Sequence, residues 1–270
     1  MIRDITIGQY YPAKSVLHRL DPRVKLVGTL LYLISLFLFN SIPGYVMTTL
    51  FLIIIIKMSR VPFSFIVRGL KPVIMLLMIT VLFNLFLTRD GAVLFHAWIF
   101  TITEGGLRTA VYMAIRLIYL IIGSSLMTFT TTPNELTDGI EELLGPLNKI
   151  HVPVHEIAMI MSIALRFIPI LLEETDKIMK AQIARGADLE SGNMIQKAKS
   201  MIPILVPLFV SAFRRANDLA MAMEARCYRG GEGRTKMKPL KYHKEDRMAY
   251  INVTVSYTHL RAHETEADLV

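Results

Sequence analysis

The sequence predicts an all-α membrane protein, in which an N-terminal bundle of transmembrane helices is followed by long cytoplasmic helices. Three observations support this fold class. First, 53% of the 270 residues are hydrophobic, and the mean hydropathy of +0.46 is high for a soluble domain although 19% are charged. Second, the net charge of +8 comes from cations that cluster beside the apolar runs. Third, residues 155–228 hold two long helical runs that end alike.

The composition also excludes several classes of protein. There is no basic patch interleaved with aromatic residues and no zinc-finger spacing, so the basic charge fits a membrane better than a nucleic acid. The single cysteine, Cys227, excludes an intrachain disulfide and a metal site made of several cysteines. The segment at residues 1–25 is polar and mixed, which is not the pattern of a cleavable signal peptide.

The polar lead-in, residues 1–25, contains the signal of a helix start. Asp21 has the residue type of an N-cap, and Pro22 that of a first-turn residue. Arg23 follows directly. Taken alone, these residues indicate only a capped helix with cations at the membrane edge.

Four apolar runs follow and predict an N-terminal membrane domain over residues 1–130. Residues 26–56 contain no charged side chain and are interrupted at residues 40–44 by Asn-Ser-Ile-Pro-Gly, which predicts a tight hairpin of two short helices. A third run covers residues 72–88, and a fourth covers residues 107–129. Together they predict four transmembrane helices.

The distribution of cations predicts the orientation of these helices. Lys57, Arg60, Arg68 and Lys71 lie between the second and third runs, whereas residues 89–106 carry few cations. The positive-inside rule therefore places the N-terminus and the loop at residues 57–71 in the cytoplasm, and residues 89–106 outside. Four crossings return the chain to the cytoplasm near Thr130.

Arg116 lies inside the fourth run. An ionisable residue within a membrane segment is a candidate functional residue. It can also extend its side chain to the interface, or pair with a carboxylate inside the bundle, and the sequence leaves these alternatives open.

Residues 131–231 are predicted to form a cytoplasmic domain. Residues 132–136, Thr-Pro-Asn-Glu-Leu, open a short amphipathic helix. The next helix is apolar almost all round from residue 155 to residue 172, where Arg166 interrupts the pattern and Pro169 predicts a kink. The last helix is expected to start near Ile202, so that Pro203 and Pro207 lie in its first turns. Arg214 and Asp218 are four residues apart and can pair weakly.

The two long runs end in the same pattern. Ala181-x-x-Ala184-Arg185-Gly186 and Ala222-x-x-Ala225-Arg226-Cys227 align when Arg185 is set against Arg226. Each arginine is favourable at a helix C-terminus, so both ends can be ordinary caps. Alternatively, they are a matched pair of helix tips. Their small residues let a partner approach, and the planar fork of each arginine binds a carboxylate on that partner.

The C-terminal residues 232–270 are predicted to be a basic, exposed linker followed by a polar tail. His259 and His263 have a spacing that can hold a metal ion on a helix, but no third ligand is evident.

These motifs resemble one family over residues 20–231, the transmembrane (T) component of energy-coupling factor (ECF) transporters, EcfT/CbiQ-like. The segments that carry the resemblance are Asp21-Pro22-Arg23, Leu165-Arg166-Phe167-Ile168-Pro169, Ala184-Arg185-Gly186 and Met223-Glu224-Ala225-Arg226. There are two departures. Cys227 stands where the family usually has glycine, which places the tight stop after Arg226 in doubt. Residues 251–270 are polar where the family usually has a last transmembrane helix.

The resemblance implies a coupling subunit in the cell membrane of a prokaryote, with long cytoplasmic coupling helices. Two ABC-type ATPases bind below it, and a substrate-binding S component packs beside it. By this resemblance, Arg185 and Arg226 are each expected to dock into a groove of one ATPase and to meet acidic residues there. The resemblance also implies that the chain itself needs no cofactor, because ATP and Mg²⁺ would be bound by the partner ATPases.

The residues agree with a non-catalytic role, since no Gly-x-x-x-x-Gly-Lys-[Ser/Thr] phosphate loop occurs. A self-sufficient transporter or channel is the alternative, but it needs a polar pathway, and Arg116 is the only charged residue in the interior of the membrane runs, since Arg108 lies at the edge of the fourth run. A membrane enzyme is disfavoured because no nucleophile–base spacing is present.

Overall fold

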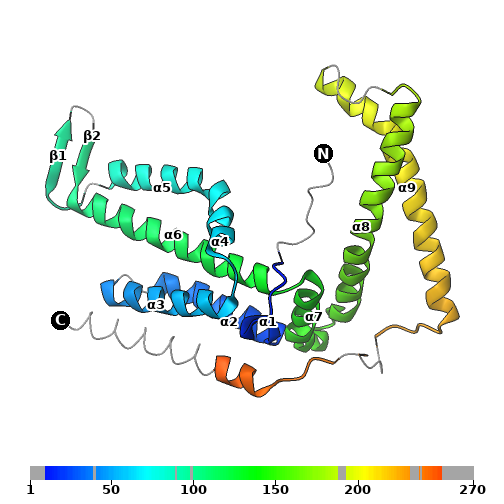
Figure 1. Ribbon diagram of the computed structural model, residues 1–270, viewed down its shortest axis with the longest axis horizontal. Helices are drawn as coiled ribbons and strands as arrows, with labels where there is room; N and C mark the ends of the chain where they lie inside the picture. Colours follow the sequence, from blue (N-terminus) through cyan, green and yellow to red (C-terminus); the bar gives the residue numbers. More distant parts are fainter. Residues whose placement is uncertain are drawn as a thin grey trace. The chain divides into compact units, whose positions relative to one another are not determined.

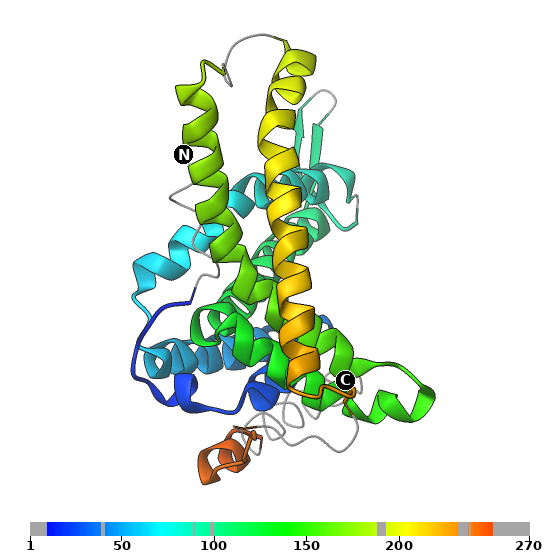
Figure 2. The same ribbon diagram turned by 90° about the vertical axis from the view of Figure 1, so that its right-hand side faces the viewer.

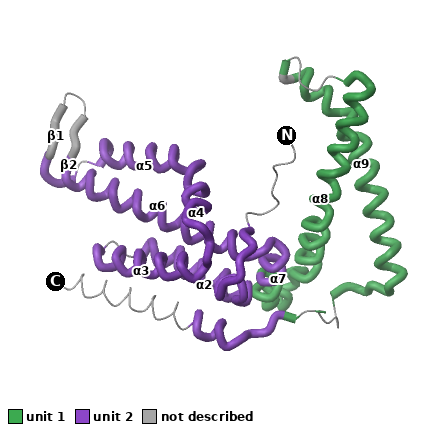
Figure 3. The backbone as a smooth tube through the Cα atoms, in the orientation of Figure 1, with its two compact units in different colours: residues 1–7, 140–239 green, residues 8–139, 240–270 purple. Residues whose placement is uncertain are grey.

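The computed structural model describes residues 10–38, 41–88, 90–97, 100–187, 193–231, 237 and 239–250. The chain divides into two compact units (Figure 3), one of residues 1–7 and 140–239 and the other of residues 8–139 and 240–270. Most described residues are helical, as the sequence predicts. The predicted tail at residues 251–270, including His259 and His263, lies outside the described residues.

The unit of residues 8–139 and 240–270 contains the predicted membrane helices (Figure 1). Its elements are α1 (Val16–Arg19), α2 (Pro22–Leu38), α3 (Ile42–Ser59), α4 (Phe63–Leu70), η2 (Lys71–Val73), α5 (Ile74–Leu87), β1 (Val93–Ala97), β2 (Phe100–Thr103), α6 (Glu104–Thr130) and most of α7 (Pro133–Leu144). The predicted hairpin is confirmed as α2 and α3. The amphipathic helix is confirmed as α7, where the Glu135 carboxylate accepts from the Thr132 amide and the Thr132 hydroxyl accepts from the Glu135 amide.

Two loops of this unit hold structure that the sequence did not indicate. The basic loop at residues 57–71 includes the helix α4, and α4 to α5 form an apolar helical stretch over residues 63–87. Ile66 of α4 is buried with Val61, Leu126 and Phe129, so the helix is stabilised by packing against α6. Residues 89–106 contain the antiparallel pair β1 and β2.

The unit of residues 1–7 and 140–239 is built on two long helices, α8 (Val154–Ala184) and α9 (Met194–Ala225), which follow the short 3₁₀ helix η3 (Gly145–Ile150). α8 continues through Pro169 to Ala184. α9 starts at Met194, earlier than predicted, because the Gln196 side chain accepts from the Asn193 amide at 3.1 Å and completes a capping box. Pro203 and Pro207 therefore lie inside α9, not in its first turns.

The two long helices run antiparallel (Figures 1 and 2). Gln182 of α8 donates to the Pro203 carbonyl at 3.2 Å, and Glu174 of α8 accepts from Arg215 at 3.0 Å. The residue of α8 that lies later in the chain, Gln182, thus contacts the residue of α9 that lies earlier, which is the order expected for antiparallel helices. The contact at Pro203 has a local cause: Pro207 has no N–H to donate to that carbonyl, so the Gln182 amide takes its place.

Five described helical stretches are long and apolar enough to cross a membrane. They are residues 42–59, 63–87, 104–130, 154–184 and 195–225. This pattern is that of a multi-pass membrane protein. Because α8 and α9 are among the five, length and composition do not separate them from the membrane helices. The cytoplasmic placement of residues 131–231 therefore stays a prediction.

Candidate functional site

The first helix end closes at Arg185 in a Schellman motif. The Gly186 amide donates to the Ile183 carbonyl at 2.9 Å, and the Ala187 amide donates to the Gln182 carbonyl at 3.0 Å. Gly186 has φ 86°, a conformation that glycine adopts without the steric cost of a Cβ. The predicted left-handed stop is confirmed here.

The second helix end closes at Arg226 in the same motif. The Cys227 amide donates to the Glu224 carbonyl at 2.8 Å, and the Tyr228 amide donates to the Met223 carbonyl at 3.0 Å. Cys227 takes the left-handed conformation with φ 56° although it is not glycine. The doubt that Cys227 raised about a tight stop is therefore resolved, because the turn forms without a glycine.

The two arginines have nearly the same backbone geometry and the same setting. Arg185 has φ −86° and ψ 4°, and Arg226 has φ −91° and ψ 12°. Both are exposed, and so are the small residues Ala181, Ala184, Ala222 and Ala225 that share the two motifs. Each end thus combines an exposed cation with exposed small residues of the same motif.

The antiparallel pairing places the two ends far apart. α8 has 31 residues, so it is about 46 Å long at 1.5 Å per residue. Arg185 follows the end of α8 that lies beside Pro203, near the start of α9. Arg226 lies in a cavity that Met159, from the first turns of α8, also lines. One cation therefore lies at each extremity of the pair.

The Arg226 end includes residues that the sequence pattern did not single out. A cavity of about 410 Å³ is lined by Met159, Met223, Arg226, Cys227, Tyr228, Arg229 and Gly230. Arg229 adds a second cation, and the two methionines offer an adaptable apolar wall. Arg229 could have been found from its position shortly after Arg226, whereas Met159 enters only through the antiparallel pairing.

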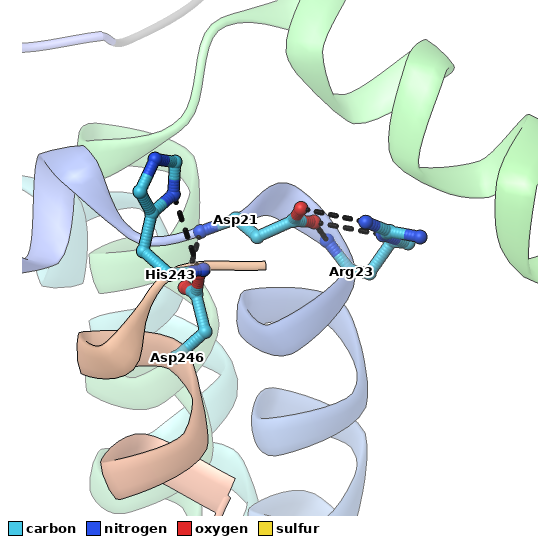
Figure 4. A network of polar contacts seen from close by, with 4 residues as sticks. All are labelled: Asp21, Arg23, His243 and Asp246. Atoms are coloured by element: carbon cyan, nitrogen blue, oxygen red, sulfur yellow. Dashed lines mark hydrogen bonds and ion pairs between the residues drawn. The ribbon is translucent and has the colours of Figure 1, made fainter. Parts of the chain in front are cut away.

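The Asp21-Pro22-Arg23 motif forms a buried polar network at the start of α2 (Figure 4). The Asp21 carboxylate accepts from the Arg23 amide at 2.9 Å and from the Arg23 guanidinium at 3.0 and 2.9 Å. The predicted N-cap is confirmed. Burial alone would raise the pKa of Asp21, but the hydrogen bonds and charge of Arg23 outweigh it and hold the pKa below its ordinary value.

The network extends to a residue far along the chain. The Asp246 carboxylate accepts hydrogen bonds from the Asp21 amide at 2.8 Å and from the His243 amide at 2.7 Å. Asp246 is buried, with 1% of its surface exposed. The Arg23 guanidinium lies 4.0 Å from the centre of the Tyr242 ring. The prediction of an exposed linker is therefore wrong at Asp246, which is buried where it accepts a hydrogen bond from the Asp21 amide.

The remaining residues that the sequence singled out do not join one site but lie at different positions on α6, α8 and α9. Arg166 and Pro169 are both exposed on α8. Arg116 of α6 lies 5.8 Å from the Phe37 ring and lines a cavity of about 290 Å³ with Arg108, Thr109, Tyr112 and Met113. Arg214 and Asp218 are exposed and form no ion pair with each other in the described part of α9. Arg215 pairs with Glu174 instead.

Comparisons with known proteins identify the family. The pattern of the family described as cobalt transport protein, CbiQ, matches residues 13–237. An energy-coupling factor transporter transmembrane protein EcfT of Clostridium kluyveri is 59% identical over 250 residues, which cover 92% of this chain and 93% of the relative. The protein of the same name in Bacillus subtilis is 49% identical over 255 residues, covering 94% of this chain and 96% of the relative.

The family match spans the membrane helices as well as both arginine ends, and the relatives align over nearly the whole chain. The chain therefore belongs to the CbiQ/EcfT family, the transmembrane components of energy-coupling factor transporters.

Proposed function

We propose that this chain is the non-catalytic coupling subunit of an ECF-type ABC importer, and that Arg185 and Arg226 each dock onto one of two ATPase subunits. The observation that carries the proposal is the repeated end: two exposed arginines, closed by the same Schellman motif, at opposite extremities of one helix pair. Two arginines in the same local geometry but far apart are better suited to bind two similar partner surfaces than a single surface.

The chemistry of docking follows from the arginine side chain. A guanidinium presents a planar fork of N–H donors that binds a carboxylate through two parallel hydrogen bonds. Each ATPase is expected to offer acidic residues in a groove that accepts the tip. Removing one partner of such a pair after it has been buried costs about 3–5 kcal/mol. The loss of a single arginine should therefore weaken the complex strongly.

The proposed mechanism transmits motion along rigid helices. ATP binding closes the two ATPases and moves the ends that carry Arg185 and Arg226. α8 and α9 pass this motion to their apolar halves, which reposition the S component for uptake of a vitamin or another micronutrient. ATP and Mg²⁺ are held and hydrolysed by the ATPases. The N-terminus and both arginine ends face the cytoplasm of a prokaryotic cell.

The test is a charge reversal at both ends. The chain with Arg185→Glu and Arg226→Glu is co-expressed with its ATPases and an S component, then assayed for co-purification and for ATP-driven uptake. We expect loss of both, with membrane insertion unchanged. The matched control is Lys177→Glu with Arg214→Glu, which makes the same change in net charge at exposed residues of the same helices, away from the ends.

Normal complex formation and uptake by the reversed chain would refute the docking role, and the arginines would then be ordinary helix caps. Uptake by this chain alone in liposomes would instead indicate a self-sufficient transporter or channel.

A further inference from the structure

The α8–α9 pair has an approximate two-fold symmetry that extends beyond its ends. The alignment that equates Arg185 with Arg226 also equates Glu174 with Arg215. The contacts follow the same symmetry. The same alignment equates the hydrogen-bonded residues Gln182 and Pro203 with residues 223 and 162, and Met223 lines one cavity with Met159, which is three residues from position 162.

The ion pair between Glu174 and Arg215 lies on the axis of this symmetry. Two elements related by a two-fold axis bring equivalent positions face to face at the axis itself. Glu174 and Arg215 are equivalent positions, and Arg215 Nη2 donates to Glu174 Oε2 at 3.0 Å. This contact therefore marks the point about which the two helices are arranged.

The charges at the axis differ between the two helices, although the ends are alike. α8 carries Glu173 and Glu174, whereas α9 carries Arg214 and Arg215 at the equivalent positions. Identical charges at a two-fold axis would face each other and repel. Opposite charges attract, so this pattern favours the pairing of α8 with α9 at this register.

The pair is also equidistant from the two ends. The stretch from Glu174 to Arg185 has the same length as the stretch from Arg215 to Arg226. At the helical rise per residue, each end is about 16 Å from the crossing contact. If the two helices rotate about this contact in opposite senses, Arg185 and Arg226 move by the same amount, because they are equally far from it.

The geometry of the contact allows such a rotation. Only one guanidinium nitrogen of Arg215 reaches the carboxylate, and its buried Nε has no hydrogen-bond partner among the described residues. The side chains of Arg215 and Glu174 are 37% and 28% exposed. A single hydrogen bond fixes one distance, whereas a two-pronged pair would also fix the relative orientation of the two groups.

We propose that Glu174 and Arg215 are positioning residues that form the pivot of the helix pair, holding α8 and α9 together while their crossing angle changes. This inference rests on the proposed function, in which the two ends are driven by the ATPases. In this proposal, the ion pair between Glu174 and Arg215 controls the distance between the two arginine ends.

The test measures the distance between the two ends in the full-length chain in lipid, without ATPases. Spin labels are attached to Lys180→Cys and Met221→Cys in a Cys227→Ser background. The two labelled positions are equivalent and exposed. Glu174→Arg or Arg215→Glu alone should broaden the distance distribution, because like charges then meet at the crossing. The double swap should restore a narrow distribution and also recover ATP-driven uptake in the complex.

Glu173→Arg and Arg214→Glu are matched controls, because they change the same charges at exposed neighbouring residues. Both should leave the distribution narrow. The pivot is overturned if the single changes at Glu174 and Arg215 leave the distances unaltered, or if the swap is as broad as the single variants. The distance readout needs no partner, so it stands or falls separately from docking, which co-purification tests.

Discussion

Cys227 closes α9 in a backbone conformation that residues other than glycine adopt at a cost. Its φ of 56° lies in the left-handed region, where a Cβ costs roughly 1–2 kcal/mol. The Schellman hydrogen bonds of Cys227 and Tyr228 hold it there. Sequence reasoning identified the position as a departure from glycine, but it could not tell whether the turn would survive. That depended on the balance between strain and these hydrogen bonds.

Cys227→Gly should therefore tighten the Arg226 end. We expect a gain of about 1 kcal/mol for the local turn, which slows hydrogen exchange of the Tyr228 amide about fivefold. Gly186→Ala at the other end is the opposite control and should speed exchange of the Ala187 amide. Unchanged or faster exchange at Tyr228 in the glycine variant would show that the turn is not strained.

Asp21 and Asp246 show which contacts of a single residue can be predicted from its neighbours in the sequence and which cannot. The Asp-Pro pattern predicted the cap at the start of α2, because the capping interaction is made between near neighbours in the chain. It could not predict the hydrogen bond between Asp21 and Asp246, which joins residues 225 positions apart. Asp246 lies in a basic stretch whose composition predicts exposure, and only its contact with Asp21 explains why it is buried.

Among the elements, the membrane helices follow from their long apolar runs. The start of α9 was missed, because Gln196, Lys197 and Lys199 give its first turns a polar pattern. Pro203 and Pro207 also favour a helix start in the sequence, because proline is tolerated in the first turn of a helix. The helix tolerates Pro207 because a side chain of α8 donates to the carbonyl that the proline leaves free. A contact from another element thus overrides local propensity, and sequence periodicity does not report it.

The antiparallel pairing of α8 and α9 is likewise a tertiary fact. The sequence predicted two equal ends but gave no direction for one helix relative to the other. The contacts of Glu174 with Arg215 and of Gln182 with Pro203 supply it. They place the two copies of the motif at opposite ends of the helix pair.

For the whole molecule, the side of the membrane on which each end lies decides between two arrangements. α8 and α9 are apolar enough to cross a bilayer. If they crossed it as an antiparallel pair, Arg185 and Arg226 would face opposite sides. If they are cytoplasmic, both ends face the same side. The charged second halves of the two helices and the basic loop at residues 57–71 favour the cytoplasmic arrangement.

Thiol labelling separates these arrangements, because Cys227 is the only cysteine and is exposed. A membrane-impermeant maleimide should label Cys227 in inside-out vesicles and not in intact cells. Lys180→Cys in a Cys227→Ser background should behave in the same way. Asp90→Cys, in the loop expected outside, is the control for the opposite side. Labelling of Lys180→Cys in intact cells would show that α8 crosses the membrane.

The central claim is that the two arginine ends dock onto two different ATPases, and cross-linking from the ends tests it most directly. A photoreactive phenylalanine analogue is placed at Ala187 or at Tyr228, equivalent positions just after the two stops. The chain is then purified with two ATPases that differ in mass. We predict that Ala187 captures one ATPase and Tyr228 the other. Capture of the same subunit from both positions, or of neither, would contradict the account.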